Sequence, residues 1–116
     1  MACIICVMKD DLKQILEFEH QRDWKQFHTP KNLAISLVLE AGEALEIFQW
    51  SKDGDLPADR QVELGEELAD IYYYLLLLAH ETGLDIQGEF QRKMKINASK
   101  YPVDKSKGNS RKYDRL

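Results

Sequence analysis

Apolar residues recur at intervals of three and four along most of the chain, which places them on one face of an α-helix. The pattern predicts four helices, over residues 10–24, 31–50, 58–82 and 86–100. The run from Tyr72 to Ala79 is continuously apolar and could pass for a strand, but it continues the helical spacing of Leu64, Leu68 and Ile71 without a breaker. The sequence therefore predicts an all-α fold.

Helix-capping residues mark several of the expected helix ends. Asp10 and Asp11 favour the start of the first helix, and Pro30 directly precedes the second. Gly83 is expected just beyond the end of the third helix, and Asp85 is expected to cap the fourth. The second and third helices are apolar around more than half of their circumference, so we expect them to be central and packed on several sides.

Length and composition place the chain among single-domain globular proteins. It has 116 residues, of which 44% are hydrophobic and 31% are charged, which is too apolar for a disordered chain and too short for two domains. We expect one domain over residues 1–102 and a basic, extended tail over residues 103–116. A chain this short must share the walls of a deep site with another subunit or give up much of its core, so we expect a homo-oligomer.

The cysteines and the N-terminal segment indicate a cytoplasmic location. Cys3 and Cys6 form a single C-x-x-C, which we interpret as an incidental terminal pair, and one pair is too few for a disulfide scaffold. The apolar run over residues 1–7 is too short for a signal sequence or a membrane span, and Met8 is a second candidate for the natural first residue. No membrane partner is expected.

Charge is segregated along the chain. Sixteen Lys and Arg against twenty Asp and Glu give a net charge of -4, which argues against binding a nucleic acid polymer. Residues 40–70 hold ten acids and two bases, whereas residues 91–116 hold nine bases and two acids. This polarity suits a site that collects cations and then a polyanion, although segregated surface charge alone would look the same.

Two pairs of acids lie at i,i+3 on the two most apolar helices. Glu40 and Glu43 share one stripe of the second helix, and Glu67 and Asp70 share one stripe of the third. Burying four carboxylates without a counter-charge is costly, so the pattern predicts a cation between these helices. The alternative is an acidic face that is solvated or paired with Lys and Arg.

The predicted ligands are all oxygen atoms, which favours a hard cation. Mg²⁺ fits best, and Mn²⁺ could substitute for it. Because Mg²⁺ usually binds a few carboxylates together with substrate phosphates, the site implies a phosphorylated ligand. A ferritin-like di-iron bundle would need two Glu-x-x-His motifs, and only Glu17 and His20 have that spacing.

Basic and aromatic residues could complete such a site. Lys93, Asn97 and Lys100 lie on one face of the fourth helix and could neutralise phosphate oxygens, or they could belong to a solvated basic helix. Trp24 and Trp50 end the first two helices, where an aromatic ring can seal the core or stack on a base.

Several short strings resemble one family in their order along the chain. They are Arg22-Asp23-Trp24, Phe27-His28-Thr29-Pro30-Lys31-Asn32-Leu33, Phe48-Gln49-Trp50, Glu66-Glu67-Leu68-Ala69-Asp70, Lys93-Met94-Lys95-Ile96-Asn97 and Tyr101-Pro102. Together with the acid pairs, they resemble the all-α nucleoside triphosphate pyrophosphohydrolases of the MazG-like superfamily, and in particular the dCTP pyrophosphatase branch. The resemblance covers about residues 20–113.

The resemblance implies a four-helix fold assembled as a tetramer, or dimer of dimers, with shared active sites. It implies Mg²⁺-dependent hydrolysis of dCTP, modified dCTP or a related dNTP to the monophosphate and pyrophosphate, which would clean the nucleotide pool. By position, Glu40, Glu43, Glu67 and Asp70 would hold Mg²⁺, and Glu40 or Glu43 would act as general base. The substrate-binding positions would be Trp24, His28, Asn32, Trp50, Tyr74, Lys93, Asn97 and Lys100.

Two departures from the family pattern leave base choice and phosphate affinity open. Ala98-Ser99-Lys100 stands where a more basic run is expected, and the loop over residues 51–59 is short. The alternative to an enzyme is a non-catalytic nucleotide-binding or helical protein-interaction module with the same fold.

Overall fold

A computed structural model of the chain describes residues 3–116, and this range contains helices and loops but no strand. The elements are α1 (Ile4–Gln21), the 3-10 helix η1 (Lys25–Phe27), α2 (Pro30–Phe48), α3 (Gln61–Glu81), α4 (Ile86–Lys100), α5 (Val103–Ser106) and the 3-10 helix η2 (Tyr113–Arg115). The all-α prediction is confirmed. The chain divides into two compact units at Leu84 and Asp85, and each is described by itself.

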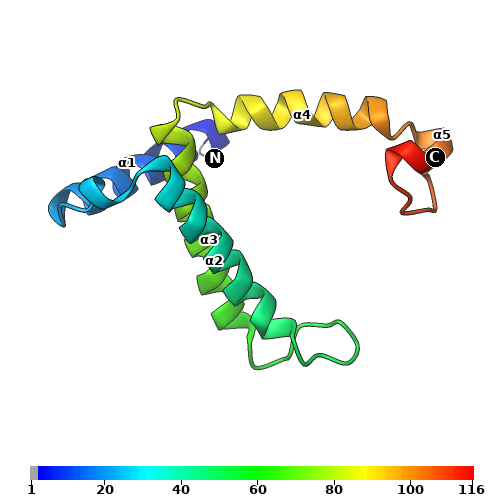
Figure 1. The fold of residues 1–116 in the computed structure, drawn as a ribbon, viewed down its shortest axis with the longest axis horizontal. Coiled ribbons are helices and arrows are strands. Elements are labelled where there is room, and N and C mark those ends of the chain that lie inside the picture. Colours follow the sequence, from blue (N-terminus) through cyan, green and yellow to red (C-terminus); the bar gives the residue numbers. More distant parts are fainter. Residues whose placement is uncertain (1–2) are drawn as a thin grey trace. The chain divides into compact units, whose positions relative to one another are not determined.

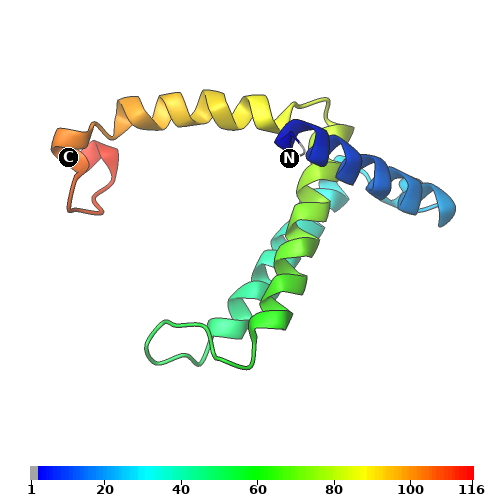
Figure 2. The same cartoon turned by 180° about the vertical axis from the view of Figure 1, so that it is seen from behind.

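The first unit is an antiparallel hairpin of α2 and α3 with α1 packed against α3 (Figures 1 and 2). Its buried apolar side chains come from all three helices and are Ile15, Leu33, Ile47, Leu76, Leu77 and Ala79. Half of them belong to the run from Tyr72 to Ala79, which is helical as predicted. The hairpin therefore holds the predicted acidic stripes of α2 and α3 next to each other.

The predicted start and end of the first helix are wrong. α1 begins at Ile4, because no breaker separates residues 4–9 from the periodic segment, and Asp10 and Asp11 lie within the helix. Asp11 instead accepts a hydrogen bond from the Tyr72 hydroxyl at 2.8 Å. The helix ends at Gln21, since Asp23 adopts a left-handed conformation with φ 53°. Trp24 therefore lies outside the helix that it was expected to end.

The expected capping signals of α2 and α3 are confirmed at two ends. Pro30 opens α2, and the side chain of Thr29 accepts the backbone N–H of Asn32 at 3.2 Å. Beyond α3, Gly83 has φ 70°. The N–H groups of Gly83 and Leu84 donate to carbonyls of the last helical turn at 3.1 and 2.9 Å. This is a Schellman motif, which satisfies carbonyls that the helix end leaves free.

The loop between α2 and α3 is longer than predicted. α2 ends at Phe48, two residues early, and α3 begins at Gln61, three residues late. The delay at α3 follows from a turn in which the Arg60 N–H donates to the carbonyl of Pro57 at 3.0 Å. Trp50 consequently belongs to the loop.

The second unit contains α4, α5 and η2. The bounds of α4 agree with the prediction, but the side chain of Asp85 makes no capping hydrogen bond. α5 and η2 give helical turns to residues 103–116, which were expected to be extended, and the rings of Tyr101 and Tyr113 meet edge to face at 6.1 Å. The assignment of residues 1–102 as one domain stays a prediction. Among the described helices, none has the length and apolar content that a bilayer crossing requires.

Candidate metal and substrate site

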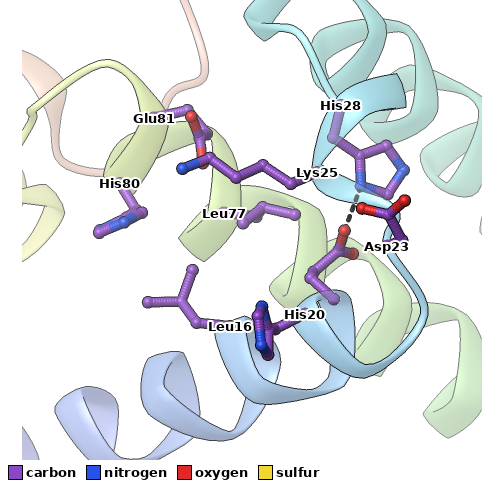
Figure 3. A pocket seen from close by; sticks show the side chains of 9 residues that line it. Leu16, His20, Asp23, Lys25, His28, Leu77, His80 and Glu81 are labelled. Atoms are coloured by element: carbon purple, nitrogen blue, oxygen red, sulfur yellow. Dashed lines mark hydrogen bonds and ion pairs between the residues drawn. The ribbon is translucent and has the colours of Figure 1, made fainter.

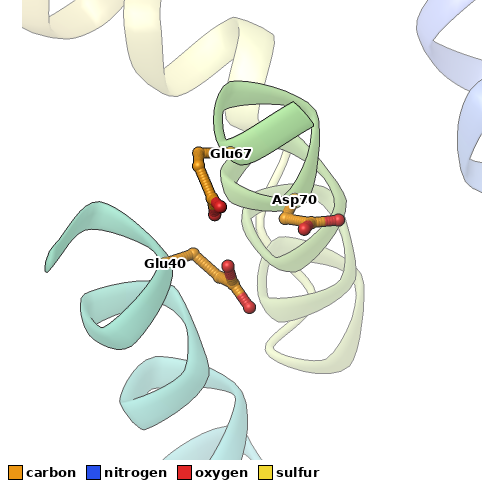
Figure 4. A group of neighbouring side chains, drawn as sticks. All are labelled: Glu40, Glu67 and Asp70. Atoms are coloured by element: carbon orange, nitrogen blue, oxygen red, sulfur yellow. The ribbon is translucent and has the colours of Figure 1, made fainter. Parts of the chain in front are cut away.

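Three of the four predicted metal ligands meet between α2 and α3. Glu40 lies on α2, and Glu67 and Asp70 lie on α3 (Figure 4). One carboxylate oxygen of each lies within 4.8 Å of the other two. The i,i+3 spacing of Glu67 and Asp70 puts both on the side of α3 that faces Glu40. This arrangement brings three hard oxygen ligands close enough to share one cation.

Two of these carboxylates have an oxygen that is buried and unsatisfied. The Oε2 atoms of Glu40 and Glu67 are inaccessible to solvent and have no hydrogen-bond partner among the described residues. A buried anionic oxygen without a partner is costly, and a bound divalent cation would satisfy both atoms. The residues present therefore fit a hard metal ion such as Mg²⁺.

Burial, and then the nearness of other acids, favours the protonated forms of Glu40 and Glu67. The pKa of Glu67 is raised to about 7, first because burial removes hydration and then because Glu43 and Glu40 lie close by. Burial, followed by the charge of Glu43, also raises the pKa of Glu40. Glu43 is exposed and is not one of the three acids whose oxygens lie together. It therefore borders the group without completing it.

A cavity of about 570 Å³ joins the acids to aromatic side chains. Glu40 and Asp70 line it, and so do Trp24 and Tyr74, both of which were predicted to bind substrate. Phe18, Tyr72 and Tyr73 add further rings. Carboxylates that can hold a cation beside flat apolar walls suit a ligand with a phosphorylated end and an aromatic ring.

Not all predicted substrate residues reach this cavity. His28 does not line it and instead lines a second pocket of about 360 Å³ (Figure 3). The Asn32 amide donates to the carbonyl of Phe27 at 2.9 Å, so it fixes the turn before α2. Trp50 is 85% exposed in the loop after α2 and also lies outside the cavity lining.

The predicted phosphate-binding residues belong to the second unit. Lys93, Asn97 and Lys100 all lie on α4, as predicted. The ammonium of Lys100 lies 4.6 Å from the centre of the Tyr113 ring, a cation–π contact. A role of these three residues at phosphate stays a prediction.

A buried acid that the sequence pattern did not single out lines the second pocket. Glu19 has 4% of its surface exposed, its carboxylate lies 2.7 Å from His28 Nδ1, and it accepts a hydrogen bond from the Tyr73 hydroxyl. The available signal was its position on the apolar face of α1, in line with Leu12 and Ile15, because acids are rarely buried unless they are paired.

Comparison with known proteins identifies the family. The sequence model of the MazG-like family matches residues 35–116. The chain belongs to the MazG-like family, which confirms the predicted resemblance at this level.

Curated relatives and a solved structure agree with this assignment. The chain is 40% identical over 114 residues to dCTP pyrophosphatase 1 of Homo sapiens and 39% identical over 113 residues to that of Mus musculus. Each alignment covers 92% of this chain and 66% of the relative, so the chain spans slightly less than two thirds of their length. The crystal structure of a pyrophosphatase from Archaeoglobus fulgidus matches with a TM-score of 0.71 and 38% identity, covering 82% of this chain and 92% of that one.

Proposed function

We propose that this chain is a Mg²⁺-dependent nucleoside triphosphate pyrophosphohydrolase that converts dCTP, modified dCTP or a related dNTP to the monophosphate and pyrophosphate. The observation that carries the proposal is the group of Glu40, Glu67 and Asp70, with two unpartnered buried oxygens, at the edge of an aromatic-lined cavity. The similarity to proteins named dCTP pyrophosphatase 1 supports dCTP as the first substrate to test. The proposed role is cleaning of the nucleotide pool in the cytoplasm.

The acids serve as metal ligands, and one of them also accepts a proton. Glu40, Glu67 and Asp70 hold the ion, and Glu43, which borders this group, is assigned as a fourth ligand only through the family resemblance. Mn²⁺ can replace Mg²⁺ because the ligands are all oxygen. When bound, the ion supplies charge neutralisation at the triphosphate and acidifies a water molecule. One carboxylate of α2, Glu40 or Glu43, accepts the proton of the attacking water.

Aromatic and basic residues bind the two ends of the nucleotide. Trp24 and Tyr74 form the wall against which the base packs, which their place in the cavity supports. His28, Asn32 and Trp50 are assigned to base and sugar only through the family resemblance. Lys93, Asn97 and Lys100 are assigned to the phosphates in the same way, and the positive charge of the two lysines supports this.

A second copy of the chain covers an exposed apolar face of α2. The face of α2 opposite its buried residues Leu33 and Ile47 carries an exposed apolar stripe, formed by Ile35, Val38, Leu39 and Leu45. A stripe of this kind is typical of an interface between protein chains. We therefore propose a homo-oligomer, as a dimer of dimers, which acts on free nucleotides and binds neither a nucleic acid polymer nor a membrane.

A product-identified hydrolysis assay tests the proposal. Purified protein is incubated with Mg²⁺ and each of the four dNTPs, and nucleotide products are separated by anion-exchange chromatography. We expect dCMP and pyrophosphate in equal amounts. Glu67→Gln should abolish turnover, whereas Glu66→Gln, which changes the exposed acid next to it, should leave turnover unchanged.

Two results would contradict the proposal. One is the absence of hydrolysis with every nucleotide, and nucleotide binding under those conditions would favour the non-catalytic module. The other is release of dCDP and phosphate, which would mean attack at a different phosphorus atom.

A further inference from the structure

Glu19 is the one charged residue that is buried among the described residues, and both of its carboxylate oxygens are used. Oε2 lies 2.7 Å from His28 Nδ1, and Oε1 accepts a hydrogen bond from the Tyr73 hydroxyl. Burial raises the pKa of Tyr73 well above its ordinary value, so that this hydroxyl stays protonated and can donate. The carboxylate is thus satisfied on both sides, as a buried charge must be.

These two contacts connect three parts of the first unit. Glu19 lies on α1, His28 lies between η1 and α2, and Tyr73 lies on α3. Figure 3 shows the bond at His28, within the second pocket. The backbone N–H of Trp24 donates to the Glu19 carbonyl at 3.1 Å, which ties the loop after α1 to the same residue.

The two partners of Glu19 contact the aromatic rings that line the cavity. The His28 ring meets Trp24 and Tyr74 edge to face, with centroids 6.2 and 6.3 Å away. The Tyr73 ring meets Tyr74 at 5.1 Å and Phe18 at 6.2 Å, also edge to face. A displacement of His28 or Tyr73 would therefore disturb the packing of Trp24 and Tyr74, since edge-to-face pairs depend on ring orientation.

We propose that Glu19 is a positioning residue for base recognition, because it holds His28 and Tyr73 and, through them, the rings of Trp24 and Tyr74. Glu19 itself does not line the cavity that contains Glu40 and Asp70. It therefore acts on the aromatic wall and leaves the metal ligands in place. The expected effect on kinetics rests on the proposed function. The inference assigns substrate discrimination to a residue outside the cavity.

The kinetic test compares two glutamates of α1. Glu19→Gln keeps the side-chain shape but removes the charge, and Glu17→Gln removes the charge of an exposed acid two residues earlier. For Glu19→Gln we expect the KM for dCTP to rise about tenfold, the effect of losing about 1.4 kcal/mol of binding. Its kcat should stay within about threefold of the wild-type value. The ratio of kcat/KM for dCTP to that for the other dNTPs should decrease. Glu17→Gln should match the wild-type protein.

A spectroscopic test is independent of turnover. With Nδ1 facing the carboxylate, His28 should carry a proton on Nδ1, which two-bond ¹H–¹⁵N couplings report. In Glu19→Gln this preference should be lost, and the indole N–H signal of Trp24 should shift. If Glu19→Gln does not fold, Tyr73→Phe, which removes a single hydroxyl group, should show the same increase in KM to a smaller extent, together with the Trp24 shift.

Failure of the inference can be told from failure of the proposed function. If the wild-type protein hydrolyses dCTP but folded Glu19→Gln keeps its KM, or loses kcat alone, the positioning role is wrong. If the wild-type protein hydrolyses no nucleotide, the proposed function fails and the NMR experiment decides the inference. Unchanged His28 couplings and an unchanged Trp24 signal in Glu19→Gln would then overturn it.

Discussion

At the residue scale, the grouped carboxylates make the metal-free fold sensitive to pH. The pKa of Glu67 is about 7 in the folded protein, whereas its ordinary value is 4.5. A folded state that binds a proton more tightly than the unfolded state is stabilised at low pH. This contribution is fully present below about pH 4.5 and is lost as the pH rises through about 7.

The first prediction concerns thermal stability without metal. In the presence of a chelator, the melting temperature of the wild-type protein should fall between pH 5.5 and pH 8. Glu67→Gln should show a smaller fall, since its amide does not titrate, and Glu66→Gln should behave like the wild-type protein. Differential scanning fluorimetry measures all three. Equal pH dependence of the wild-type protein and Glu67→Gln would contradict this account of Glu67.

A second prediction follows from the same cluster. Mg²⁺ should raise the melting temperature at pH 8, because an ion that binds only the folded state stabilises it by mass action. The increase should be lost in Glu67→Gln, which removes a ligand charge, and kept in Glu66→Gln. A wild-type protein that gains no stability at millimolar Mg²⁺, Mn²⁺ or Ca²⁺ would argue against a cation site at these acids.

The acids show how far residue-level prediction reaches. Spacing predicted that Glu67 and Asp70 share one face of α3, because i,i+3 residues lie on one side of a helix, and in the structure their carboxylates meet that of Glu40. Their role as metal ligands stays a prediction. The same rule could not distinguish Glu43, since its distance from α3 depends on how the two helices are rotated against each other. Glu19 was missed because its partners, His28 and Tyr73, are 9 and 54 residues away in the sequence.

At the element scale, the predictable helix ends are those where the backbone itself imposes a stop. Proline fixes its own φ and Gly83 adopts φ 70°, so the start of α2 and the end of α3 followed from residue type. The ends of α1 did not, because aspartates such as Asp10 are tolerated inside a helix and the left-handed turn at Asp23 has no glycine to mark it.

The third prediction compares a glycine at the end of α3 with a glycine inside α3. Gly83→Ala should destabilise the protein by about 1 kcal/mol, because alanine is strained at positive φ. Gly65→Ala should stabilise it by up to about 1 kcal/mol, since Gly65 is inside α3 and a Cβ atom there would meet nothing within 4 Å. Urea denaturation measures both changes. Effects of the same sign would contradict the assignment of the α3 end.

At the scale of the whole molecule, the apolar pattern of α2 exceeds what the first unit buries. The sequence predicted a helix packed on several sides, yet within the first unit Val38 remains 70% exposed and Leu45 69% exposed. Periodicity shows that a face is apolar but not whether the same chain or another one covers it. The proposed homo-oligomer would cover this face, and reasoning from the sequence of one chain cannot place the second copy.

The last prediction is that introducing charge into this stripe separates the subunits. Light scattering coupled to size-exclusion chromatography should give the wild-type protein a mass of two or four chains, and Val38→Glu should shift it toward one chain, because a carboxylate buried at an apolar interface is costly. Gln49→Glu adds the same charge at an exposed position past the end of α2 and should not change the mass. A wild-type protein that elutes as a single chain would contradict the proposed assembly.

If subunits also share active sites, Val38→Glu should lose dCTP hydrolysis in proportion to its dissociation. Raising the protein concentration should then restore the oligomer and the hydrolysis together.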